Sequence, residues 1–188
     1  RATTSLVGNT VTIDGAVTVR ATGSPAAGFS QASFIAGQAS ISPSGIFTNV
    51  ADRVEVNAAL NVNGPNANVS LIGKHIAISE EVVINDAPAN TGNAGANTGF
   101  YVGRLLNEPG ATATIDIDAP ITINGAVTRV ALTGTDVNVR APINVNGSYA
   151  SFRAGASFFS AVGLTQFGAG FEYRGNVDGV SVDVDAPI

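Results

Sequence analysis

The sequence contains no cysteine, methionine or tryptophan, and His75 is the single histidine among its 188 residues. Without cysteine the chain cannot form a disulfide framework, hold Cys-ligated zinc or use a catalytic thiol. One histidine also excludes a multi-histidine metal site built from this chain alone. We therefore expect no metal, no cofactor and no catalytic residue.

Charge is also scarce. Charged residues make up 12% of the chain, the net charge is −5 and the isoelectric point is about 4.6. Nucleic acids and anionic membranes bind basic faces, so neither is expected as a partner. No segment is apolar for the roughly 18 to 20 residues that a membrane helix needs. Hydrophobic residues make up 45% of the chain, which is enough for a continuous core.

What the sequence does contain is an internal repeat. The motif is apolar-x-apolar, a short break, then apolar-x-apolar again, and its copies start at residues 11, 54, 76, 115, 137 and 180. The starts lie 43, 22, 39, 22 and 43 residues apart, and alternate starts lie 65 or 61 apart. A second marker, Leu-x-Gly at 6–8, 71–73 and 132–134, keeps the same spacing. Because the long gaps are about twice the short one, they predict an intermediate turn with a weaker motif.

The alternation within the motif has the period of a β-strand. Val, Ile and Thr dominate these runs, and such residues favour strands. No stretch has the period of an amphipathic helix, so we predict an all-β chain. In the copy at 137–146, the residues predicted to point inward are Val137, Val139, Ile143 and Val145, and those predicted to point outward are Asn138, Arg140, Asn144 and Asn146.

Two architectures are compatible with this pattern. Asn-Gly between alternating runs, as at 63–64, 124–125 and 146–147, is a hairpin signal that would suit an antiparallel β-sandwich. A fixed period near 21 residues favours a parallel β-solenoid of about nine coils, with Val11, Ile76 and Val137 in related columns. We favour the solenoid, as a single β-helical segment over 1–188. Because Asp185–Ile188 repeats the start of a longer internal string at Asp118–Ile121, we expect a fragment of a larger repetitive protein.

Three segments are less regular than the motif copies. Residues 21–33 and 85–99 are predicted to be loops outside the core. Segment 148–178 differs because it holds five of the nine phenylalanines. They either stack inside the coils or form an exposed ligand-contact surface. These residues are Phe152, Phe158, Phe159, Phe167 and Phe171.

Paired aspartates are the strongest candidates for chemistry. Asp116 and Asp118 lie two residues apart on one expected strand, as do Asp183 and Asp185, so each pair faces one side. Paired carboxylates suit glycoside chemistry and can hold calcium. However, they recur at equivalent repeat positions and have few bases nearby, Arg129 and Arg140 being the nearest in sequence. Solvent-facing strand positions are therefore the favoured interpretation.

The remaining polar residues favour structural roles. His75 is predicted to lie on the surface or in a turn, and Glu80-Glu81 at a solvated corner. Outward asparagines could stack as amide ladders or bind sugar hydroxyls. The candidates are Asn57, Asn61, Asn138 and Asn144.

Two segments resemble a known family. Residues 69–78 (VSLIGKHIAI) and 53–64 (RVEVNAALNVNG) are similar to coils of the filamentous-haemagglutinin exoproteins of Gram-negative bacteria. Residues 41–47 (ISPSGIF) resemble the Asn-Pro-Asn-Gly-Ile stretch of that family's secretion domain, with Ser in place of both Asn. The resemblance implies a right-handed parallel β-helix, two-partner secretion, a secreted or surface-held location and work in adhesion. The outer-membrane transporter would then be a partner.

The function expected from these observations is structural and adhesive, not enzymatic. The segment would be a shaft of a large secreted bacterial surface adhesin, and it would mediate or present attachment to a host receptor, glycan or matrix. We expect the rod to be monomeric. The alternative is a β-helix protein that binds or degrades polysaccharide, such as a lyase, hydrolase or tailspike.

Overall fold

The computed structural model describes residues 1–22, 31–41, 47–86, 98–103, 112–147, 149–155 and 181–184. These residues form β-strands joined by turns and corners, with no helix among them. The all-β prediction is therefore confirmed for this part of the chain. A membrane-spanning helix of sufficient length and apolarity is likewise absent from the described ranges.

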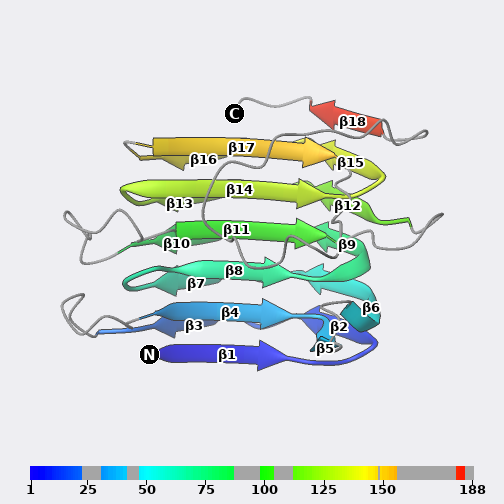
Figure 1. The fold of residues 1–188 in the computed structure, drawn as a ribbon, viewed down its shortest axis with the longest axis horizontal. Coiled ribbons are helices and arrows are strands. Elements are labelled where there is room, and N and C mark those ends of the chain that lie inside the picture. Colours follow the sequence, from blue (N-terminus) through cyan, green and yellow to red (C-terminus); the bar gives the residue numbers. More distant parts are fainter. Residues whose placement is uncertain are drawn as a thin grey trace.

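The strands form three parallel sheets, which the chain visits in a fixed order (Figure 1). We call them sheets A, B and C in the order of these visits. Each visit adds one strand beside the strand from the previous visit, and the paired strands are in register. This is the arrangement of a parallel β-solenoid, and the described strands do not form the antiparallel sandwich. The one antiparallel pair joins β5 to β6.

Sheet A is drawn at the front of Figure 1, where its strands stack in sequence order. It contains β1 (Ala2–Leu6), β4 (Ala32–Ala36), β8 (Asn68–Leu71), β11 (Thr98–Gly103), β14 (Val127–Thr133) and β17 (Tyr149–Gly155). Sheet B contains β2 (Thr10–Ile13), β6 (Phe47–Val56), β9 (Gly73–Ile78), β12 (Thr114–Ile117), β15 (Asp136–Val139) and β18 (Ser181–Val184), with β5 (Gln38–Ile41) beside β6. Sheet C contains β3 (Val17–Arg20), β7 (Leu60–Asn63), β10 (Val82–Asn85), β13 (Ile121–Asn124) and β16 (Ile143–Asn146).

The core is built from columns of identical or similar side chains. In sheet B, Val11, Val54, Ile76, Ile115 and Val137 are successive register partners, and each is buried. This confirms the predicted column of Val11, Ile76 and Val137. Residues from strands of all three sheets point into one continuous apolar cluster, so burial of these columns is what stabilises the stack.

Inward and outward positions in β15 and β16 follow the prediction. Val137, Val139 and Ile143 are completely buried, and Val145 is partly buried against the core. Their polar neighbours are less buried. Asn138 is partly exposed, whereas Arg140, Asn144 and Asn146 are exposed.

The long gaps of the repeat do not contain the expected intermediate turn. Val11 pairs directly with Val54 across 43 residues, and Ile76 pairs directly with Ile115 across 39. The expectation of nine coils came from halving these gaps. Since the strands at both ends are neighbours in one sheet, each gap is a single circuit enlarged by longer connections.

Three smaller expectations also need correction. Segment 21–33 is not all loop, since Ala32 and Ser33 begin β4 and both are buried. Segment 85–99 likewise includes Asn85 of β10 and the first two residues of β11. The last motif copy starts at Val182 and not at Val180, because Val182 is the register partner of Val137.

The Asn-Gly pairs are corners between sheets and not hairpin turns. Asn63 ends β7 in sheet C, and β8 begins in sheet A five residues later. Gly64 has a φ of 146°, and Asn66 has a φ of 53° in the left-handed region. Glycine and asparagine tolerate this region best, which explains their place at the corner.

Candidate functional site

The outward face of sheet B carries the aspartates singled out in the sequence. Asp116 lies in β12, Asp118 follows that strand, and Arg140 follows the neighbouring strand β15. Arg140 Nη1 donates to Asp118 Oδ1 at 2.7 Å, and Arg140 Nη2 donates to Asp116 Oδ1 at 3.1 Å. Asn138 Nδ2 also donates to Asp116 Oδ1 at 3.1 Å. The two carboxylates thus share one face, as predicted, and both bind a cation on the next strand.

This arrangement links neighbouring strands. The hydrogen bonds that Arg140 donates, first to Asp118 and then to Asp116, raise the pKa of Arg140 above its ordinary value. The side chains are 33% to 51% exposed, so solvent screens the pairs and they contribute little to stability. Arg129, the other base named from the sequence, lies in β14 of sheet A. Asp183 lies in β18 and is the register partner of Asn138 in β15. Asp185 lies outside the described residues.

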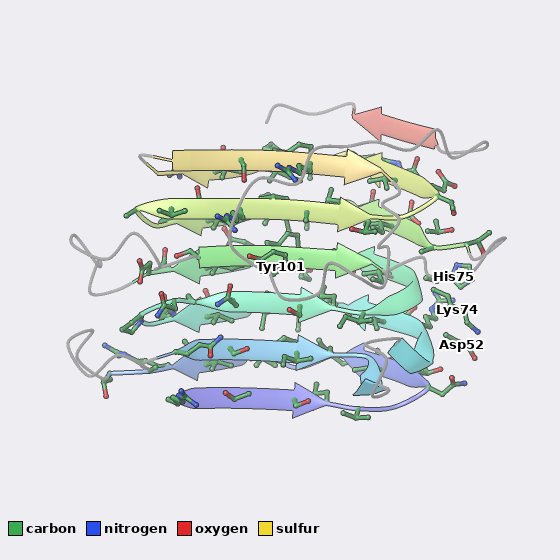
Figure 2. The ribbon with its side chains drawn as sticks, in the orientation of Figure 1. Asp52, Lys74, His75 and Tyr101 are labelled. Carbon is green, nitrogen blue, oxygen red and sulfur yellow. The ribbon has the colours of Figure 1, made fainter. Side chains whose placement is uncertain are left out.

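A second polar group lies where sheet A turns into sheet B (Figure 2). Lys74 Nζ lies 2.5 Å from Asp52 Oδ1, and Asn9 Nδ2 donates to Asp52 Oδ2 at 2.8 Å. The Lys74 hydrogen bond is the main cause that lowers the pKa of Asp52, and the Asn9 bond adds to it. His75 is exposed beside Lys74. Three successive circuits of the chain are joined here by side chains.

Other outward residues of sheet B form similar links. Arg53 pairs with Glu55 on the same strand at 2.5 Å. Asn57 Nδ2 donates to Asp14 Oδ1 at 3.0 Å, and Ser79 Oγ donates to Asn57 Oδ1 at 3.1 Å. The predicted solvated corner is confirmed, since Glu80 and Glu81 are both exposed, as is the surface position of His75.

An amide ladder is present, but at a different position from the one expected. Asn85 Nδ2 donates to Asn63 Oδ1 at 2.7 Å, Asn124 Nδ2 donates to Asn85 Oδ1 at 2.8 Å, and Asn146 Nδ2 donates to Asn124 Oδ1 at 2.9 Å. These four residues end successive strands of sheet C and are register partners. We call them the Asn ladder.

The asparagines proposed from the sequence have other roles. Asn57 and Asn138 bond to aspartates of the adjacent strand. Asn61 and Asn144 take no part in the side-chain hydrogen bonds of the described residues. Three members of the Asn ladder, Asn63, Asn124 and Asn146, precede a glycine in the sequence, a pattern that by itself indicates a turn. The fourth member, Asn85, precedes Asp86.

The outward face of sheet A carries a partly buried tyrosine, Tyr101 of β11 (Figure 2). Burial raises the pKa of Tyr101, and the charge of Arg129 opposes this rise. A Cβ built on Gly99 would collide with the ring carbons Cε2 and Cζ of Tyr101. The outer part of the ring therefore lies over Gly99, and a larger residue there would displace it.

Of the five phenylalanines proposed as a ligand-contact surface, the structure describes one. Phe152 is partly buried and packs against the core from β17. It follows Val130 and Phe100 in one column of sheet A, as aromatic stacking inside the coils would place it. Phe158, Phe159, Phe167 and Phe171 lie outside the described residues. Ligand contact by this segment stays a prediction.

One corner between sheets C and A contains buried polar groups. Thr98 and Thr128 are fully buried register partners, and their hydroxyls have no hydrogen-bond partner within the described ranges. Nearby, Asp86 Oδ1 accepts a hydrogen bond from the Asn66 backbone N–H at 3.2 Å. Across the described ranges, no group of three or more His, Cys, Asp or Glu side chains is placed to hold a metal ion.

Comparison with known proteins adds no relative, because no family model, no curated protein and no solved structure matches this chain.

Proposed function

We propose that this chain is a shaft segment of a large secreted bacterial surface adhesin of the filamentous-haemagglutinin type. The observation that carries the proposal is the uninterrupted stack, in which core columns run from β2 to β15 without a break in register. A stack held together by contacts between neighbouring circuits suits a stiff spacer that presents a binding region away from a surface.

The finer architecture belongs to the same proposal. We assign a right-handed coil, because parallel strands joined by crossovers are right-handed in nearly all known cases. We assign six coils, since the longest path through a sheet has six strands. At a strand spacing of about 4.8 Å, this stack is roughly 25 to 30 Å high.

Two features of the sequence support secretion and surface location. The absence of cysteine suits a chain that is exported unfolded through an outer-membrane transporter, which would be its partner during secretion. The resemblance of residues 53–64 and 69–78 to coils of secreted adhesins points the same way. The target would be a host receptor, a glycan or the extracellular matrix.

The test is binding of the purified chain to epithelial cells and to a panel of glycans, with release of reducing ends recorded in the same wells. Saturable binding without release is the expected result. No binding to any cell or glycan would mean that this segment acts only as a spacer, and that other parts of the protein bind the target.

A second candidate is supported by one observation, the Asp116–Arg140–Asp118 group on the sheet B face. Carboxylates beside an arginine on a β-helix face resemble the catalytic residues of polysaccharide lyases and hydrolases. In this chain both carboxylates bind the same guanidinium. Release of reducing ends by the wild-type chain, abolished in Asp116→Asn, would favour the enzyme and overturn the shaft.

A further inference from the structure

Charge is distributed unevenly over the outward faces of the stack. The chain carries a net charge of −5, yet none of the six strands of sheet A contains Asp or Glu. The strands of sheet B hold Asp52, Glu55, Asp116, Asp136 and Asp183. The outward face of sheet A does carry two arginines, Arg129 and Arg153, so this face is locally basic on an acidic protein.

These two arginines differ from the basic residues of sheet B. Arg53, Lys74 and Arg140 each bind a carboxylate at 2.5 to 3.1 Å. Arg129 and Arg153 make no ion pair or hydrogen bond in the part of the chain that the structure describes. A guanidinium on a folded surface can form two parallel hydrogen bonds to a carboxylate, and here both groups retain that capacity.

Strand register brings the arginines together with Tyr101. Ala131 is the register partner of Tyr101 on one side and of Arg153 on the other, while Arg129 precedes Ala131 by two residues on the same strand. Neighbouring strands lie about 4.8 Å apart and alternate residues about 6.6 Å apart, so all three long side chains originate within about 7 Å of Ala131. The Tyr101 ring lies over Gly99, which is the register partner of Arg129, so the phenol lies on the Arg129 side of this group. The phenol and the two guanidinium groups can all donate hydrogen bonds.

We infer that this group, Tyr101, Arg129 and Arg153 around Ala131, binds a carboxylate of an acidic glycan chain. The inference rests on the proposed adhesive function and names the class of ligand for it. Charge complementarity supports an anion here, since no carboxylate of sheet A competes for the arginines. The phenol supplies a third donor and an aromatic ring against which a sugar can pack.

The surroundings favour a glycan over an acidic peptide. β11 and β14 are paired on both sides, so their backbone groups cannot accept an added peptide strand. The neighbouring outward residues Ser70 and Ser151 carry hydroxyls, and the small Ala131 side chain offers no deep apolar pocket for a peptide side chain. Hydroxyls and flat, small residues suit sugar hydroxyl groups.

The experiment measures affinity of the purified full chain for three polysaccharides: polygalacturonate, which carries carboxylates, neutral dextran, and dextran sulfate. We expect salt-sensitive binding to polygalacturonate and none to dextran. Arg129→Gln/Arg153→Gln should weaken this binding by about ten-fold or more, as expected for loss of charge-assisted hydrogen bonds. Tyr101→Phe, which removes one donor, should weaken it less.

The matched control is Arg20→Gln/Arg53→Gln, which removes the same charge from sheets C and B. It should bind polygalacturonate as the wild type does, and circular dichroism should show that both variants fold. Equal losses in the two double variants would overturn the site, and binding to dextran sulfate alone would overturn the carboxylate assignment.

Cell binding by the same proteins separates the two proposals. If Arg129→Gln/Arg153→Gln loses polygalacturonate binding and cell binding together, both proposals are supported. If it binds both polygalacturonate and cells as the wild type does, the glycan inference is overturned and the adhesive function remains. If the wild type binds polygalacturonate but no cell, the adhesive function fails while the site stands.

Discussion

Val139 and Asn144 lie five residues apart in two successive strands, β15 of sheet B and β16 of sheet C, and their surroundings are opposite. Val139 is fully buried and has Ile117 and Val184 as its register partners, whereas Asn144 is exposed. Val139→Asp would place a carboxylate in the core without a partner, and we expect a loss of about 4 kcal/mol or complete unfolding. Asn144→Ala should change stability by less than about 0.5 kcal/mol. Urea denaturation of both variants measures the difference.

Similar losses of stability in these two variants would contradict the inward and outward assignment of this strand pair. Isoleucine at position 139 serves as a control, because Val139→Ile keeps the core apolar. Its cost should be that of an added methylene, about 1–3 kcal/mol if the core cannot adjust.

Asp52 should titrate at an unusually low pH. Lys74 and Asn9 stabilise its charged form in the folded state, so its folded pKa lies below the ordinary value of 3.8. A lowered carboxyl pKa adds stability above the ordinary value, and this stability is lost as the pH falls through the folded pKa. Carboxyl-carbon NMR should show the Asp52 midpoint rising towards 3.8 in Lys74→Gln. An unchanged midpoint would mean that Lys74 does not stabilise the Asp52 carboxylate.

At this scale the alternation was predictable, because a period of two in Val and Ile is a direct consequence of strand geometry. The Asn ladder was not. Asn61 and Asn144 have the same outward phase as a ladder residue, but the ladder forms at Asn63 and Asn146, where the strands end. A strand end depends on the corner that follows, and the local pattern does not define it.

The Asn ladder should contribute measurably to the cohesion of sheet C. Asn85 is an inner member, which donates to Asn63 and accepts from Asn124. Asn85→Ala removes both bonds and should cost about 1–2 kcal/mol in thermal or urea unfolding. Asn144→Ala is the matched control, because Asn144 lies in the same sheet two residues before the ladder residue Asn146. A cost for Asn85→Ala no larger than for this control would show that the ladder contributes little.

The last residue of β11 must be glycine. Gly103 has a φ of 115°, and a Cβ there would collide with the Thr133 carbonyl oxygen. Gly103→Ala should therefore destabilise the fold by about 2–4 kcal/mol through strain and displacement of β14. Gly15 is the matched control, because a Cβ at that position would have nothing within 4 Å. Calorimetry should give a clearly lower melting temperature for Gly103→Ala than for Gly15→Ala. Equal melting temperatures would contradict the requirement for glycine at position 103.

Strands of sheets B and C could be found from the sequence, whereas several strands of sheet A could not. The motif pairs at 11–19 and 54–62 are strands of sheets B and C in succession. β4 (Ala32–Ala36) contains two Ala and one Phe, β11 (Thr98–Gly103) contains two Gly and one Phe, and both lack the regular Val and Ile alternation. Tertiary pairing on both sides holds such segments in strands despite their weak local preference.

For the whole molecule, two kinds of circuit alternate. Circuits of 22 residues join Val54 to Ile76 and Ile115 to Val137, and circuits of 39 to 45 residues separate them. One short and one long circuit together span 61 to 67 residues, which accounts for the double period near 61 to 65 seen in the sequence. The sequence could reveal this double period, but it could not show whether a long gap holds one circuit or two. Only the pairing of distant strands decides that question.

The most direct test of this account is a disulfide between positions 18 and 61. Thr18 and Asn61 are register partners in β3 and β7, 43 residues apart, and Val83 is the next outward residue of the same column. Neighbouring strands lie about 4.8 Å apart, within the range that a disulfide can bridge, and strands two apart lie near 9.6 Å, beyond it. The chain has no native cysteine to interfere.

Under mild oxidation, Thr18→Cys/Asn61→Cys should form an intramolecular disulfide in the folded protein, and Thr18→Cys/Val83→Cys should not. Mass spectrometry of the unreduced tryptic peptides reports both outcomes. Failure of the first pair to cross-link, or equal cross-linking of the two pairs, would contradict direct stacking across the long gaps of the repeat.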